Sequence, residues 1–118
     1  MSTALDRTRA ACLSLPETTE QVAWGAPTWR VRKKIFCMFA DNHHDDGRLA
    51  VWCPAPPGVQ PILLARDADT FFHPPYVGVK GWIGVVVDRV DDAELRELMV
   101  QAYCLIAPKK LAALVDDG

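Results

Sequence analysis

The histidines and acids are the residues of this sequence best suited to catalysis or metal binding. His43, His44, Asp45 and Asp46 form one polar run, but neighbouring ligands in a single turn do not fix a metal's geometry without a distant partner. His73 precedes two prolines, and the sequence provides no partner that would make it a general base. The sequence motifs of nucleotide-binding loops, serine hydrolases and zinc proteases are also absent. We therefore predict no enzyme activity, no catalytic residue, no bound metal and no cofactor.

Cysteine chemistry is a further possibility, and the sequence argues against it. The four cysteines are far apart, and none belongs to a C-x-x-C pair. Each lies in an apolar stretch, where a reduced cysteine packs as a small hydrophobic side chain. A chain of 118 residues buries enough surface to fold without disulfide bonds. We expect reduced, structural thiols at Cys12, Cys37, Cys53 and Cys104.

The basic side chains indicate a binding function. The net charge of the chain is −2, but the charges are segregated, because residues 21–40 contain no acid. The cations of this interval are Arg30, Arg32, Lys33 and Lys34. At the tip of a two-stranded β-ribbon, such side chains can contact phosphates and reach base edges. The pattern predicts weak, phosphate-dominated binding of nucleic acid such as DNA, with outer contacts from Lys80, Lys109 and Lys110. The alternative interpretation is a solvated turn whose charges protect the sheet edge.

The aromatic side chains indicate a different kind of binding function. The chain has many large rings for so small a domain, namely Trp24, Trp29, Trp52, Tyr76 and Trp82, and Tyr76 follows two prolines in an irregular stretch. Such rings can line a groove that binds a protein segment or a small ligand. In most domains, however, rings of this kind belong to the hydrophobic core. The sequence leaves both interpretations open.

The periodicity of hydrophobic residues predicts the elements that carry these side chains. Apolar residues spaced by three and four predict helices, while alternation and short apolar runs predict strands. A hairpin with a basic tip joins the alternating strand around Trp29 and Val31 to an apolar strand over 35–40. The other expected elements are strands over 49–53 and 82–87 and helices over 3–14, 61–68, from 91 to Pro108, and after Pro108.

Together these elements predict a single domain over residues 1–118. It belongs to the α+β class and has two layers, an antiparallel β-sheet and helices packed on one face of that sheet. No segment approaches the ~20 apolar residues that a membrane helix requires, and residues 1–9 lack the pattern of a secretion signal. We therefore expect a cytoplasmic protein without a membrane partner, and a monomer rather than a dimer.

Three parts of the sequence resemble the MmcQ/YjbR family, in the family's own order. The first part contains Leu15-Pro16-Glu17, Trp24-Gly25-Ala26-Pro27-Thr28-Trp29-Arg30-Val31 and Lys34-Ile35-Phe36. The other two contain Phe72-His73-Pro74-Pro75-Tyr76-Val77-Gly78 with Gly81-Trp82, and Tyr103 with Ala107-Pro108-Lys109-Lys110-Leu111. The resemblance implies a small bacterial protein whose fold is similar to that of secretion chaperones and frataxin-like domains, with DNA binding of the "double wing" type. The family usually has a glycine in the hairpin turn before the lysine that matches Lys34, whereas Arg32-Lys33 makes the basic tip stronger here.

Overall fold

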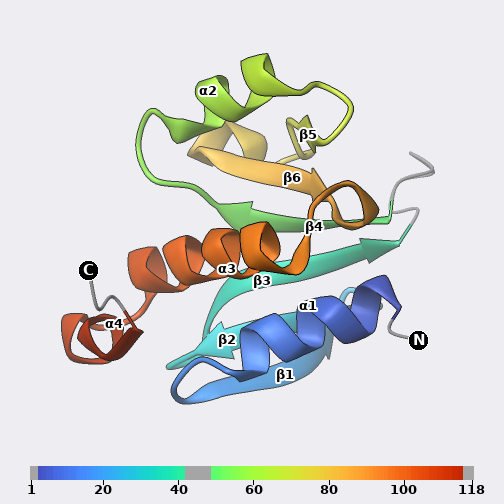
Figure 1. The fold of residues 1–118 in the computed structure, drawn as a ribbon. Coiled ribbons are helices and arrows are strands. Elements are labelled where there is room, and N and C mark those ends of the chain that lie inside the picture. Colours follow the sequence, from blue (N-terminus) through green and yellow to red (C-terminus); the bar gives the residue numbers. More distant parts are fainter. Residues whose placement is uncertain (1–2, 42–48, 116–118) are drawn as a thin grey trace.

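The computed structural model of this protein describes residues 3–41 and 49–115, and Figure 1 shows it as a ribbon. The polar run from His43 to Asp46 lies outside the described residues. The elements, in chain order, are α1 (Ala4–Leu13), β1 (Thr18–Ala23), β2 (Ala26–Val31), β3 (Lys34–Asp41), β4 (Leu49–Pro54), α2 (Val59–Arg66), β5 (Phe71–Phe72), the 3-10 turn η2 (Gly78–Lys80), β6 (Trp82–Val86), the 3-10 turn η3 (Val87–Arg89), α3 (Asp92–Ile106) and α4 (Lys109–Val115). None of the helices in these two ranges is long and apolar enough to cross a membrane.

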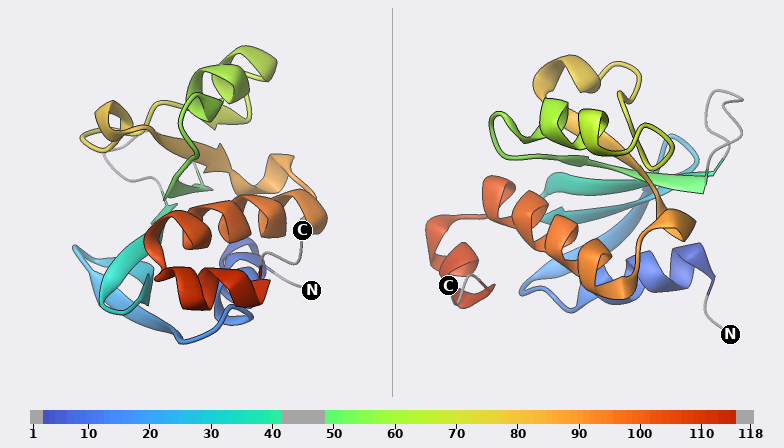
Figure 2. Two further views of the ribbon diagram at one scale, coloured as in Figure 1. Left: turned by 90° about the vertical axis from the view of Figure 1, so that its left-hand side faces the viewer. Right: turned by 45° about the horizontal axis from the view of Figure 1, so that its top comes forward.

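The strands in the described ranges form one antiparallel sheet in the order β1-β2-β3-β4-β6-β5. In the left view of Figure 2, α3 and α4 lie to the right of the sheet and η2 lies to its left. The helices α1 to α4 all contribute to one core cluster, through Cys12 of α1, Leu63 of α2, Met99 of α3 and Leu111 of α4. The predicted α+β class, with an antiparallel sheet covered by helices on one face, is therefore confirmed.

The first three strands are joined by two tight turns of the same kind. Trp24 and Gly25 connect β1 to β2 with φ angles of 52° and 76°, and Arg32 and Lys33 connect β2 to β3 with φ angles of 50° and 70°. A two-residue loop with positive φ at both positions is a type I′ turn, which matches the twist of the flanking strands. The predicted hairpin with a basic tip is thus confirmed, although neither residue of its turn is a glycine.

Side-chain caps form at the starts of α1 and α3, the helices expected from residues 3 and 91. The Thr3 hydroxyl accepts a hydrogen bond from the Asp6 amide at 3.0 Å, while the Asp6 carboxylate accepts one from the Thr3 amide at 3.2 Å. The Asp91 carboxylate caps α3 by accepting from the Glu94 amide at 2.8 Å. These bonds satisfy amides that have no partner within the first turn of a helix.

A β-bulge in β3 changes which side chains face the helices. Trp29 of β2 lies opposite Cys37, but the next residue, Arg30, lies opposite Ile35, so that Phe36 is an extra residue. Phe36 and Cys37 are both fully buried in the core cluster beneath the helices. Because side chains alternate across a strand, this extra residue turns Ile35 toward the opposite, open face of the sheet.

Two strands were not expected from the sequence. β1 lies at the edge of the sheet and has a mostly polar sequence, Thr18–Ala23, which gives little hydrophobic signal. β5 consists only of Phe71 and Phe72, paired with Val85 and Gly84 of β6. Both strands form because they pair with a neighbouring strand, and polar or very short segments of this kind carry weak local preferences.

Candidate ligand groove on the open face of the sheet

The face of the sheet opposite the helices carries a second group of buried apolar side chains. Open faces of antiparallel sheets are usually polar, because they contact water. Here the buried members are Ala26, Met38, Ala40, Ala50, Trp52 and Phe72. Met38 and Trp52 lie directly opposite each other on β3 and β4, so they form a continuous apolar surface at the middle of the sheet.

A groove of about 630 Å³ lies over this surface. Ile35, Met38, Trp52 and Trp82 come from the strands beneath it, while Trp24 and residues 75–77 reach it from two connecting segments. The only side-chain nitrogen and oxygen atoms of these lining residues are the tryptophan ring nitrogens and the Tyr76 hydroxyl. This size is typical of small-molecule sites, which measure ~300–1,000 Å³, and the lining suits an apolar body.

Trp24 and Tyr76, which reach this groove from different connecting segments, share two unfavourable properties. Each has a positive φ, 52° for Trp24 and 66° for Tyr76, and each is largely exposed, at 76% and 79%. The left-handed conformation costs roughly 1–2 kcal/mol for a residue with a bulky side chain. A ring that is three-quarters exposed offsets only part of that cost by burial. Strained residues of this type cluster at ligand sites, where the strain fixes a side chain in the position that binding requires.

A side-chain amide from α2 holds one wall of the groove in place. The Gln60 amide nitrogen donates to the carbonyl of Gly78 at 2.8 Å and to the carbonyl of Trp82 at 2.5 Å. The Gly78 amide in turn donates to the Pro74 carbonyl at 2.9 Å, which closes the turn that carries Tyr76. Gln60 therefore connects the proline-rich wall to the start of β6.

Two glycines allow aromatic rings to pack closely beside the groove. A Cβ atom at Gly84 would lie 2.4 Å from the Phe72 ring, which rests on the open face of β6. A Cβ atom at Gly78 would lie 2.3 Å from the His73 ring. His73 thus packs against the wall segment, in agreement with a structural role for this histidine.

Trp29, one of the rings expected in a groove, lies on the other face of the sheet. It is fully buried in the core cluster, and its indole nitrogen donates to the Glu20 carboxylate at 3.0 Å. Arg9 also donates to Glu20, at 2.8 and 3.0 Å. These hydrogen bonds, chiefly those from Arg9, lower the pKa of Glu20 below its usual value. The structure therefore corrects the placement of Trp29, while Trp24, Tyr76 and Trp82 do line the groove.

The basic residues of the hairpin tip differ in their partners. Arg32 is engaged, because its guanidinium donates to the Glu17 carboxylate at 2.9 and 3.2 Å. These bonds from Arg32 lower the pKa of Glu17, with a smaller contribution from Lys110. Lys33 and Lys34 are exposed and make no ion pair in the part of the chain that the structure describes.

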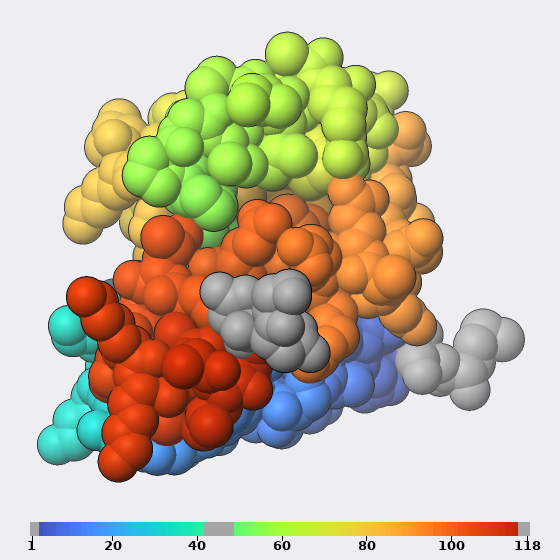
Figure 3. All heavy atoms as spheres, turned by 60° about the vertical axis from the view of Figure 1, so that its left-hand side comes forward, coloured from blue at the N-terminus to red at the C-terminus, as the bar shows by residue number. Residues whose placement is uncertain are grey.

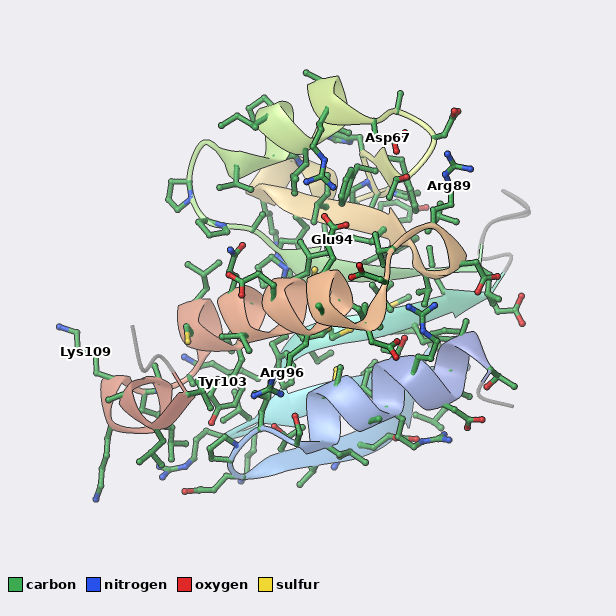
Figure 4. The ribbon with its side chains drawn as sticks, viewed as in Figure 1. Asp67, Arg89, Glu94, Arg96, Tyr103 and Lys109 are labelled. Atoms are coloured by element: carbon green, nitrogen blue, oxygen red, sulfur yellow. The ribbon has the colours of Figure 1, made fainter. Side chains whose placement is uncertain are left out.

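The hairpin tip and α4 lie next to each other. Figure 3 shows the hairpin beside α4, and Figure 4 shows Lys109 projecting away from the end of α4. Lys33, Lys34, Lys109 and Lys110 are therefore gathered at one end of the molecule. Lys80, in η2, lies apart from them, two residues before Trp82 of the groove. Arg30 lies on the open face of β2.

The thiols have the structural role expected of them. Cys12, Cys37 and Cys53 are buried and form no disulfide, and Cys104 is half-buried and equally unbridged. Burial raises the pKa of the Cys53 thiol to about 12 and that of Cys37 well above its usual value. These two side chains stay protonated at neutral pH and are poor nucleophiles. Within residues 3–41 and 49–115, no three potential metal-ligating side chains come together.

The sequence includes Trp52 among the aromatic rings that can line a groove, but it did not identify Ile35 and Met38 as parts of one. A signal was present, because the segment 35–40 is apolar at successive positions and must therefore present apolar side chains on both faces of the sheet. That pattern indicates a central strand, but it does not distinguish a face covered by helices from a face that binds a ligand.

The chain is similar to known proteins both in sequence and in fold. The YjbR family model matches residues 13–105 of the chain. The crystal structure of Deinococcus radiodurans protein DR2400, which has a DUF419 domain, is similar with a TM-score of 0.72 and 20% sequence identity, over 89% of this chain and 78% of that chain. At this identity the likeness shows a shared fold. No curated protein matches the chain.

Proposed function

The chain belongs to the YjbR family, and from this premise we propose that it is a non-enzymatic binding protein whose open-face groove takes a small, largely apolar ligand. The observation that carries the proposal is the pair of strained, exposed rings, Trp24 and Tyr76, beside an apolar groove of about 630 Å³. Most of the surface of each ring is exposed where it lies, and both rings are positioned to contact a bound molecule.

The lining supports binding in preference to reaction chemistry. Among the described residues that line the groove there is no acid, no histidine and no cysteine, which are the side chains that most often transfer protons or form covalent intermediates. The polar atoms that it does contain are few and lie on rings, an arrangement that orients a ligand without activating it. The unbridged cysteines are consistent with a reducing compartment such as the cytoplasm, which we include in the proposal.

A neutral, flat probe tests this function directly. We expect 2-naphthalenemethanol to bind the protein and to change its tryptophan fluorescence, because three of the lining residues are tryptophans. Tyr76→Ala should weaken binding by at least tenfold, since interface aromatic residues commonly contribute more than ~1.4 kcal/mol. Tyr76→Ala should leave the melting temperature nearly unchanged, because the ring is mostly exposed.

The matched control is Leu114→Ala on α4, which also removes a large exposed side chain but lies away from the groove. It should bind the probe as the unmodified protein does. A probe that fails to bind at millimolar concentration, or one that binds equally well to the Tyr76→Ala protein, would contradict the proposal.

Nucleic-acid binding is the second candidate, and the gathering of lysines at one end of the molecule favours it. Lys33 and Lys34 make no ion pair among the described residues, and α4, which begins with Lys109 and Lys110, lies beside their hairpin. Arg32 is expected to contribute less to phosphate binding than its position at the hairpin tip suggests, because the Glu17 carboxylate already neutralises its charge. Binding would be weak and mainly to phosphate, with a dissociation constant around 10⁻⁴–10⁻⁶ M at physiological salt.

The salt dependence of DNA binding tests this second candidate. Removing one phosphate contact reduces the salt slope by roughly 0.9, so the double variant Lys33→Ala/Lys34→Ala should flatten it by nearly two. Arg96→Ala is the control, because Arg96 lies on α3 and its guanidinium is bonded to the Ser14 hydroxyl at 2.7 Å. Absence of binding to duplex and single strand at low salt would eliminate this candidate and leave the ligand groove unaffected.

A further inference from the structure

Arg30 lies beside the groove, on the open face of β2. Its neighbours Trp29 and Val31 have side chains in the core beneath the helices, so the alternation of the strand turns Arg30 to the opposite face. Arg30 pairs across the sheet with Ile35, a lining residue. Its Nε lies 3.4 Å from the Thr28 hydroxyl oxygen, so the guanidinium lies along the strand toward Thr28.

Thr28, the residue that contacts the Arg30 guanidinium, is itself fixed in the sheet. Thr28 is buried, its hydroxyl donates to the Gln21 carbonyl at 2.7 Å, and it pairs across the sheet with Met38 of the groove floor. The Arg30 guanidinium is thus held over β2, next to two residues that line the groove, by a threonine that is itself fixed.

Arg30 has no acidic partner among the described residues, unlike several other arginines of this protein. Carboxylates neutralise Arg7, Arg9, Arg32 and Arg66. Arg30 is half-buried, yet it makes no ion pair in the part of the chain that the structure describes. Its two terminal nitrogens can therefore serve as the planar, forked donor that matches a carboxylate.

The charged residues closest in sequence to the lining residues have the same sign. The charged residues within two positions of any lining residue are Lys33, Lys34 and Lys80, and no acid lies that close along the chain. A concave apolar surface with cations at its border attracts anions and concentrates the field at its opening. The groove therefore combines an apolar interior with the Arg30 guanidinium beside it.

From this combination we infer that the ligand is a planar aromatic acid, whose ring system contacts Trp24 and Tyr76 while its carboxylate binds the Arg30 guanidinium. The inference rests on the proposed ligand-binding function and adds the chemical class of the ligand. Flat rings are favoured because aromatic walls stack on them, and the carboxylate is favoured because it supplies an anionic partner for Arg30.

Three related compounds test this class by calorimetry. 2-Naphthoate should bind 10- to 100-fold more tightly than its neutral counterpart 2-naphthalenemethanol, because a hydrogen bond to a charged group contributes about 1.5–3 kcal/mol. The saturated acid decahydronaphthalene-2-carboxylate should bind at least tenfold more weakly than 2-naphthoate, because it cannot stack. Arg30→Gln should reduce the preference for 2-naphthoate over the alcohol to about one, with the affinity for the alcohol unchanged.

Two further variants keep the outcomes distinct. Arg96→Gln removes an arginine from the helix-covered side and should keep the full preference, while Tyr76→Ala should weaken both naphthyl compounds alike. Equal binding of the acid and the alcohol to the unmodified protein would overturn the inference, as would a preference that survives Arg30→Gln. If the alcohol and the acid both fail to bind, the proposed function itself is wrong.

Discussion

Trp24 occupies the first position of the turn between β1 and β2, followed by Gly25. Trp24→Asn would create Asn-Gly, the pair preferred in type I′ turns, because asparagine tolerates positive φ. The substitution should therefore remove strain from the backbone and, at the same time, remove one wall of the groove. We expect it to separate ligand affinity from folding stability.

The expected change in stability follows from two opposing contributions. Relief of the left-handed conformation stabilises the variant by roughly 1–2 kcal/mol. Trp24 is 76% exposed, so about a quarter of its surface is covered; a buried aromatic side chain covers ~150–250 Å², and the loss is therefore about 50 Å², or ~1.2 kcal/mol at ~25 cal/mol per Å². The free energy of unfolding should change by less than about 1 kcal/mol, which corresponds to a few degrees in Tm.

The expected change in affinity is larger. An aromatic residue that anchors a ligand typically contributes ~2 kcal/mol or more, so the dissociation constant for 2-naphthalenemethanol should rise about 30-fold. Urea unfolding followed by circular dichroism, together with calorimetric titration of the probe, measures both quantities on one sample. A loss of stability above about 3 kcal/mol would show that Trp24 is a core residue, and an unchanged affinity would show that it is not a wall of the site. Either result refutes the reasoning.

Three further predictions concern other parts of the fold. Lys33→Gly should raise the free energy of unfolding by about 0.5–1 kcal/mol, because glycine adopts the φ of 70° without strain, whereas Lys33→Ala should give no such gain in urea unfolding. Gly84→Ala should cost about 1–3 kcal/mol, because its Cβ would collide with the Phe72 ring, and the double variant with Phe72→Ala should lose less than the sum of the two single changes. Glu20 has a pKa below its usual value of 4.5, so its ionised form stabilises the fold fully above that value and progressively less as the pH falls through the lowered pKa. Glu20→Gln should therefore be less stable than the unmodified protein at neutral pH, with a gap that narrows in acid, and a gap independent of pH would contradict this role.

The parts of the fold that the sequence predicts well are those decided by neighbouring residues. The N-cap at Asp91 and the helical spacing of Leu95, Leu98 and Met99 are local properties, and α3 forms where they predict it. The basic hairpin follows from the short connection between an alternating strand and an apolar run. These signals depend only on residues that are close in sequence, so they can be recognised without knowledge of the tertiary contacts.

The parts that escaped prediction depend on contacts between distant segments. β5 exists because Phe71 and Phe72 pair with β6, and two residues cannot show a periodicity of their own. Trp29 was grouped with the groove rings because its type matched theirs, whereas the register of β2 turns it toward the helices. The groove itself combines residues from several separate segments, and residue type does not reveal which side of the sheet each one faces.

The bulge at Phe36 makes the tolerance of β3 to changes in length depend on where the change falls. Removing one residue at the bulge would restore regular pairing with β2, with Cys37 still facing the helices and Ile35 still facing the groove, because the bulge already absorbs the extra residue. Between Cys37 and Asp41 no bulge is present to absorb a change, so the loss or gain of one residue there would exchange the faces of the residues on one side of it. Substitutions along this strand can accumulate in evolution one at a time, whereas such an insertion or deletion moves several side chains to the other surface of the sheet in a single event. Changes in strand length are therefore expected at the bulge rather than beyond it.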